Sequence, residues 1–245
     1  MQNTRNYDEE FQDTSSHQYA YEFDEVLRKF MIREFSQFVV GVSVLEMGCF
    51  EGDFTKYLAK HYEKVHVIEA SKTLAEIAEK KLPKNVTFTQ STFEMAILDE
   101  KYDAIFIIHT LEHLDSPIEV LKKTQSWLKP GGRLVIAVPN ALAPSRQIAV
   151  KMGIINQNTS VTEDEWRQGH RTTYSLDSLN AEVKSSGFSV IRSGGVFFKS
   201  LANFQLDAAL RSGIINEEFL EGSYQLGMHY PELCASIYVV CEFKT

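Results

Sequence analysis

The sequence has little positive charge, few cysteines and no long apolar run. Its 245 residues include 25 Lys and Arg against 33 Asp and Glu, which gives a formal net charge of −8. Because a protein that binds nucleic-acid phosphates needs a basic surface, no nucleic-acid partner is expected. The three cysteines, Cys49, Cys234 and Cys241, lack the spacing of metal ligands, so we expect reduced thiols, a cytoplasmic location and no metal. No apolar stretch reaches the length of a membrane span, so no membrane partner is expected either.

Two common nucleotide-binding signatures are also missing. No G-x-x-x-x-G-K-[ST] segment occurs, so a P-loop site is not expected. A dinucleotide-binding loop would read G-x-G-x-x-G, but Phe50 stands where its second glycine would be. An NAD-dependent enzyme is therefore disfavoured.

The segment from Val42 to Gly52 combines an apolar run, an acidic residue and a glycine loop, and a helical pattern follows it. This order predicts a strand, a turn and a helix, whose start offers free N–H groups. Gly48 and Gly52 lack a Cβ, so the backbone there can take a positive φ and let a ligand approach closely. Because Glu46 and Glu51 flank the loop with negative charge, it suits a cationic ligand better than a pyrophosphate.

Apolar periodicity along the rest of the chain predicts alternating strands and helices, as in one α/β domain. We expect a helix over residues 21–38. Strands are expected near residues 42–46, 65–69, 86–89, 102–108, 134–140, 188–191 and 235–243. The single domain, 1–245, would then carry an N-terminal helical cap, 1–40, and two insertions on the substrate side, 141–174 and 195–233.

Three separate motifs together resemble one family. An E-x-G-x-x-x-G pattern spans Glu46 to Gly52, and Glu69 ends the next strand a little over ~20 residues after the loop begins. The run from Tyr102 to Asn140 then contains YD, LEH, LKPGG and PN in that order. These motifs resemble class I S-adenosylmethionine (SAM) methyltransferases of the small-molecule type, the methyltransferase type 11/12 group. The resemblance implies a three-layer, Rossmann-like α/β fold, with a seven-stranded, mostly parallel sheet whose last strand is antiparallel, and insertions that form a lid.

The same resemblance implies SAM as the cofactor and assigns residues to it. Glu69, at the end of the second strand, would accept hydrogen bonds from the ribose hydroxyls. The loop after the third strand would contact the adenine. The cofactor-binding candidates are Glu46, Gly48, Cys49, Phe50, Gly52, Glu69, Ala70, Ser91, Thr92, Phe93 and His109.

Three histidines are the candidate catalytic residues. Methyl transfer from a sulfonium is a direct displacement, so a general base is needed only where the nucleophile starts protonated. His109 ends the fourth strand and would contact the cofactor's methionine portion or the acceptor. His113, in the LEH segment, either shapes the pocket or acts as the base. His170, in the first insertion, either binds an anionic group together with Arg171 or anchors its loop.

The expected acceptor is a small polar molecule that is methylated on oxygen or nitrogen. Tyr21 and its neighbour Tyr19 are candidates for a flap over the ligand. Arg146, His170 and Arg171 would face an anionic acceptor, or the two arginines would be ordinary surface groups. We consider a sugar or surface-glycan precursor and a quinone-type phenol as acceptors. A SAM-binding protein without turnover is the alternative function, and the aromatics of the second insertion fit either a substrate pocket or a homodimer contact.

Overall fold

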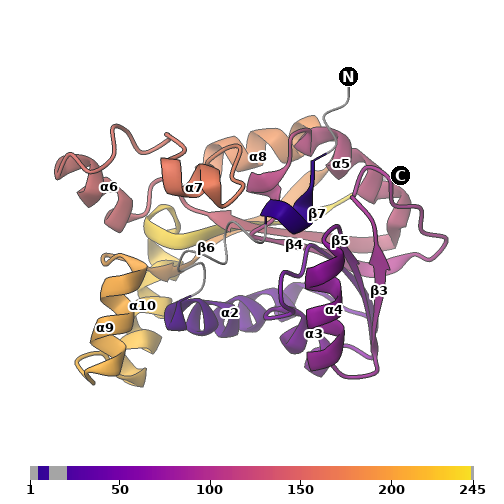
Figure 1. The fold of residues 1–245 in the computed structure, drawn as a ribbon, viewed down its shortest axis with the longest axis horizontal. Coiled ribbons are helices and arrows are strands. Elements are labelled where there is room, and N and C mark those ends of the chain that lie inside the picture. Colours follow the sequence, from indigo (N-terminus) through magenta and orange to yellow (C-terminus); the bar gives the residue numbers. More distant parts are fainter. Residues whose placement is uncertain (1–4, 11–20, 244–245) are drawn as a thin grey trace.

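A single mixed sheet organises the molecule. The computed structural model describes residues 5–10 and 21–243, and its strands lie in the order β3-β2-β1-β4-β5-β7-β6 (Figure 1). β7 pairs antiparallel with β5 and β6, whereas the other pairs are parallel. The strands are β1 (Ser43–Met47), β2 (Lys64–Glu69), β3 (Val86–Gln90), β4 (Tyr102–Ile108), β5 (Leu128–Pro139), β6 (Ser189–Phe198) and β7 (Cys234–Glu242). The expected seven-stranded Rossmann-like sheet with an antiparallel last strand is confirmed.

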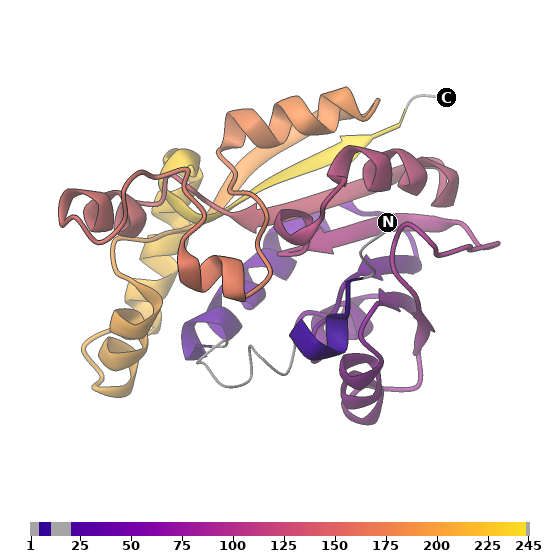
Figure 2. The ribbon, with the colours of Figure 1, turned by 45° about the horizontal axis from the view of Figure 1, so that its top comes forward.

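Helices cover both faces of the sheet and complete three layers (Figures 1 and 2). Successive strand residues point to opposite faces, so Val44 packs with α2 and α3 while Leu45 packs with α5 and α8. Because both faces are buried, the central strands are apolar throughout rather than alternating. The helices are α2 (Glu22–Phe35), α3 (Thr55–His61), α4 (Lys72–Lys81), α5 (Pro117–Thr124), α6 (Pro144–Lys151), α7 (Glu163–Arg167), α8 (Leu176–Ser185), α9 (Asn203–Arg211) and α10 (Glu217–His229).

Helix α2 is the expected N-terminal amphipathic helix, and its start is fixed by a distant residue. Phe23, Leu27 and Met31 recur at helical spacing and are buried. The buried carboxylate of Asp207 on α9 accepts the backbone N–H groups of Glu22 at 3.1 Å and Phe23 at 2.9 Å. These are N–H groups that a helix start leaves unpaired. The second insertion therefore holds the N-terminal helix in place.

Strand β6 is longer than the predicted 188–191 and continues into the segment expected to begin the second insertion. Its glycines are there for close packing, not for a turn. A Cβ at Gly194 would lie 2.7 Å from the Tyr238 ring, and one at Gly195 would clash with the carbonyl of Pro231. The strand therefore reaches Phe198, and the helices of the second insertion follow it.

The two insertions project at the same end of the molecule. Helices α6 and α7 belong to the first and α9 and α10 to the second, and both views place these pairs at one end of the sheet (Figures 1 and 2). Within residues 5–10 and 21–243, no helix is both long and apolar enough to cross a bilayer.

Candidate functional site

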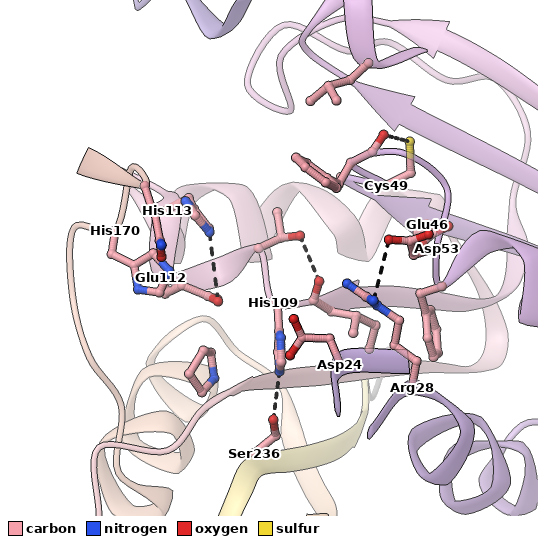
Figure 3. Close-up of a pocket in the computed structure, with 18 of the residues that line it drawn as sticks. Asp24, Arg28, Glu46, Cys49, Asp53, His109, Glu112, His113, His170 and Ser236 are labelled. Carbon is pink, nitrogen blue, oxygen red and sulfur yellow. Dashed lines mark hydrogen bonds and ion pairs between the residues drawn. The ribbon is translucent and has the colours of Figure 1, made fainter. Parts of the chain in front are cut away.

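A cavity of about 370 Å³ opens at the carboxyl ends of β1, β2 and β4. Strand order reverses between β1 and β4, which is where open α/β sheets bind ligands. Residues from the glycine loop, α2, the LEH segment, the first insertion and the N-terminal stretch 5–10 line it. Figure 3 shows Glu46 and Cys49 on one side of this cavity and Glu112, His113 and His170 on the other.

The glycine loop has a tight geometry that explains its residues. Gly48 has φ +80°, and a Cβ there would lie 2.8 Å from the side chain of Thr110. Gly52, with φ +86°, does not line the cavity. Its backbone packs against Leu82, the residue that follows α4. Gly48 thus lets the loop backbone approach the Thr110 side chain, whereas Gly52 lets the start of α3 pack closely against α4.

Two carboxylates lie buried beneath the loop. Glu69 accepts the backbone N–H groups of Cys49 and Ser71, each at 3.0 Å, and burial raises the pKa of its carboxyl group. Glu46 is 1% exposed and one of its oxygens has no partner among the described residues. Burial, together with the nearby charge of Glu69, raises the pKa of Glu46 to about 8, and Arg28 partly opposes this. Both carboxylates become easier to ionise when a cation enters the cavity.

Glu51 lies elsewhere than the sequence suggested. Its carboxylate pairs with Lys81 of α4 at the surface, so it adds no charge to the cavity. The acidic character of this end therefore comes from Glu46 and Glu69 alone among the predicted acids. Of the predicted cofactor residues, the cavity lining includes Glu46, Gly48, Cys49, Phe50, Glu69, Ala70, Thr92, Phe93 and His109, whereas Gly52 and Ser91 lie outside it.

His109 sits in a strained and enclosed position at the end of β4. It has φ +50°, its N–H donates to the Ala137 carbonyl at 2.8 Å, and its Nε2 lies 2.8 Å from the hydroxyl of Ser236. Burial, reinforced by the charge of Arg28, lowers the pKa of His109 to about 3. The ring is therefore neutral at physiological pH and suits contact with a ligand better than proton uptake.

His113 and His170 come together in space with a buried acid that the sequence analysis missed. Their rings meet edge to face with centroids 4.6 Å apart. Glu112 is 1% exposed, and its Oε1 lies 4.0 Å from Nε2 of His113. Burial raises the pKa of Glu112 to about 8. Burial, followed by the nearby His170 and Arg5, lowers the pKa of His113. No spacing rule links residues from two distant segments, so this cluster had no sequence signal.

Residues 5–10 close one side of the cavity. Arg5 donates to the carbonyls of His113 at 2.6 Å and Gly169 at 3.3 Å. Asp8 accepts the Ser71 hydroxyl at 2.5 Å at the start of α4, and Tyr7 lines the cavity. This stretch therefore bridges the LEH segment and the cofactor side. Tyr21 also lines the cavity, while Tyr19 lies outside the described residues.

Arg146 and Arg171 do not line this cavity, and both guanidinium groups are engaged in loop contacts. Arg146 pairs with Glu165 at 2.5 Å and donates to main-chain carbonyls of the same insertion. Arg171 bonds Asp115 at 3.2 Å and stacks 4.7 Å from the centre of the Trp166 ring. Neither is an ordinary exposed surface group, since their side chains are 14% and 24% exposed, and both are left out of the acceptor site proposed below.

The cavity holds different cations, which the sequence analysis missed. Lys199, just after β6, bonds the side chain of Asn203 and lies 5.7 Å from the centre of the Phe23 ring. Burial lowers the pKa of Lys199 to about 8, and the charge of Asp24 works against this. Arg28 of α2 lies 3.5 Å from Asp53. The sequence around Lys199 predicts an exposed side chain, because a lysine that follows a strand usually lies at the surface. The packing of α2 and α9 encloses it instead.

Solved structures of SAM-dependent methyltransferases share this Rossmann-like fold. A SAM-dependent methyltransferase from Thermotoga maritima aligns with a TM-score of 0.64 at 17% identity, covering 96% of this chain and 100% of that one. The glycopeptide N-methyltransferase MtfA, solved with SAM bound, aligns with a TM-score of 0.56 at 18% identity, covering 88% of this chain and 86% of its own.

The chain belongs to the methyltransferase-domain family, whose model matches residues 17–193. A malonyl-[acyl-carrier protein] O-methyltransferase from Halalkalibacterium halodurans is 30% identical over 158 residues, 58% of this chain and 56% of that protein. A ubiquinone biosynthesis O-methyltransferase from Coxiella burnetii is 29% identical over 104 residues, 41% of this chain and 44% of that protein. The matches thus span about half the length of these curated relatives. The family expected from the motifs is confirmed.

Proposed function

We propose that this protein transfers a methyl group from SAM to an oxygen or nitrogen atom of a small polar acceptor that carries an anionic group. One observation carries the proposal: a single cavity joins an acidic end, built on Glu46 and Glu69, to an end that holds Lys199. The first suits a cationic methyl donor, and the second suits an anion. Such a cavity can align a nucleophile with a methyl carbon and exclude water.

The donor would occupy the acidic end. Backbone N–H groups of Cys49 and Ser71 fix the carboxylate of Glu69, which lines the cavity where ribose hydroxyls would donate to it. Thr92 and Phe93 line the wall beyond Glu69, where the adenine would lie. Glu46 would face the positive charge of the methionine portion, and its burial strengthens that attraction.

The acceptor would occupy the end formed by α2, β6 and the LEH segment. Lys199 offers an ammonium group to a carboxylate or phosphate, and the neutral rings of His113 and His170 can accept a hydrogen bond from a hydroxyl or amine of the acceptor. A sugar or surface-glycan precursor with an acidic group meets these demands. A quinone-type phenol is the second candidate, supported by the similarity to ubiquinone biosynthesis O-methyltransferases.

Calorimetric titration with SAM and with NAD tests the donor, and the formation of S-adenosylhomocysteine tests turnover. We expect SAM to bind, NAD not to bind, and Glu69→Gln to weaken SAM binding at least tenfold through lost ribose contacts. Product formation on a panel of acidic sugars, phenols and amines then separates an enzyme from a SAM-binding protein without turnover. A preference for NAD, or SAM affinity unchanged in Glu69→Gln, contradicts the proposal.

A further inference from the structure

Three side chains at the acceptor end of the cavity have the donor types that bind divalent metal ions. Glu112, His113 and His170 each present one ligand atom, and these atoms all lie within 4.8 Å of one another. Glu112 and His113 belong to the 3-10 turn Leu111–His113, whereas His170 follows α7 in the first insertion. Two imidazole nitrogens and a carboxylate oxygen are a common ligand set for first-row transition metals. Cysteine spacing predicted no metal, and it carries no information about histidine and carboxylate ligands.

Glu112 supplies the independent observation. Its side chain is almost fully buried, and neither carboxylate oxygen has a hydrogen-bond partner among the described residues. Three guanidinium groups of the surrounding loops have other partners, since Arg5 and Arg146 pair with Glu10 and Glu165 and Arg171 bonds Asp115. A buried polar group without a partner calls for an explanation, and a bound ion is one of the few available.

His113 is oriented as a metal ligand would be. The Nδ1 side of its ring faces the backbone of Gly169, where a Cβ would come within 3.1 Å, and the ring hydrogen-bonds this residue's backbone. A proton held on Nδ1 by a carbonyl leaves the lone pair on Nε2. That atom faces Glu112, with 4.0 Å between Nε2 and Oε1. A backbone carbonyl that fixes the ring tautomer is typical of histidines that bind metals.

We propose that Glu112, His113 and His170 form a site for one divalent transition metal ion of the Zn²⁺ type, with a coordination position open to the cavity. Ligand atoms at tetrahedral Zn²⁺ lie about 3.4 Å apart, so the side chains need to move by about an ångström or less. If the proposed function holds, the open position faces the acceptor. The ion would then bind an acceptor hydroxyl and make it more acidic, with the two histidines serving as ligands rather than as the base.

Cobalt titration of the untagged full-length protein, stripped with EDTA, tests the site without SAM or acceptor present. We expect one equivalent of Co²⁺ to bind with visible d–d absorption, and Zn²⁺ to displace it. Glu112→Gln and, separately, His170→Gln should weaken binding at least about 100-fold, the upper range reported for residues that only support ligands. His229→Gln, an exposed histidine at the end of α10, is the matched control and should bind like the wild type.

Two results would overturn the inference: no d–d absorption with the wild type, or unchanged Co²⁺ affinity in Glu112→Gln. Thermal melting shows that each variant is folded, and His170→Gln on the first insertion carries the test if Glu112→Gln does not fold. The same samples are also titrated with SAM. The SAM titration also separates the two proposals. Binding of Co²⁺ without SAM upholds the metal site and contradicts the proposed function, and binding of SAM without Co²⁺ does the reverse.

Discussion

SAM binding should release a proton from Glu46, because burial holds this carboxyl group in its protonated form at neutral pH. Its pKa is raised to about 8 by burial and by the neighbouring carboxylate of Glu69, whereas the Thr55 hydroxyl and Arg28 act in the opposite direction. A sulfonium in the cavity favours the ionised form, so binding and deprotonation are coupled.

The size of the effect follows from the ionised fraction of Glu46. With a pKa of about 8, about 1% is ionised at pH 6 and about half at pH 8, so SAM affinity should rise about 50-fold over this range. At pH 7 about one molecule in ten is ionised, which weakens binding about tenfold relative to a permanently charged carboxylate.

Isothermal titration calorimetry at pH 6, 7 and 8 measures this coupling. Measurements in two buffers with different ionisation enthalpies give the number of protons released at each pH. The amino group of SAM also titrates near pH 8, so the informative quantity is the difference between the wild type and Glu46→Gln. We expect Glu46→Gln to bind SAM more weakly at pH 8 and to lose most of the pH dependence. Glu51→Gln, in the same loop but paired with Lys81 at the surface, is the matched control and should behave like the wild type.

The stability of the empty protein provides a second readout with a fixed sign. The raised pKa means that the folded chain binds this proton more tightly than the unfolded chain does. The contribution of Glu46 to stability is therefore lost as pH rises from about 4.5 to about 8. In the absence of SAM, the melting temperature of Glu46→Gln minus that of the wild type should increase as pH rises from 6 to 8. Identical pH profiles of affinity and melting for the two proteins would refute the reasoning.

Three further changes test other parts of the structure. Because burial lowers the pKa of Lys199 to about 8, its charge is lost as pH rises through that value, and KM for an anionic acceptor should rise above pH 8. Lys199→Gln should remove this pH dependence and leave SAM affinity unchanged. Gly48→Ala should destabilise the fold by about 1–2 kcal/mol and weaken SAM binding, since φ is +80° and the new Cβ meets Thr110; thermal melting and titration measure both. Asp207→Asn should cost about 1–2 kcal/mol of unfolding free energy in urea denaturation by weakening the two bonds that hold the start of α2, and unchanged stability would contradict this role.

The cofactor end could be predicted from the sequence because its determinants are local. Strand, turn and helix follow one another around Gly48, and Glu69 is placed by the length of a single helix and strand. Parallel strands then bring their carboxyl ends to one edge, so topology alone collects these residues. Glu51 shows the limit of such reasoning: it lies in the right loop, but its side chain points to Lys81 and the surface.

The acceptor end could not be predicted because it is assembled by packing between distant segments. Lys199 is enclosed only when α2 and α9 pack beside it, and Glu112 meets His170 only when the first insertion folds back over the LEH turn. Sequence charge drew attention to Arg146 and Arg171 instead. Since a guanidinium group satisfies carboxylates and carbonyls of its own loop equally well, composition does not separate an anchor from a binding group.

The same division limits what the relatives imply about the acceptor. The family model ends at residue 193, whereas Lys199 and Asn203, which form part of the acceptor end, lie beyond it. The donor half of the cavity thus rests on the matched region, and the acceptor half draws on a segment outside it. An acceptor inferred from the matched region would therefore leave Lys199 and Asn203 out of account. The chemistry of Lys199, Glu112 and the two histidines is the better guide, and it favours an acceptor with an anionic group and a hydroxyl within reach of the methyl donor.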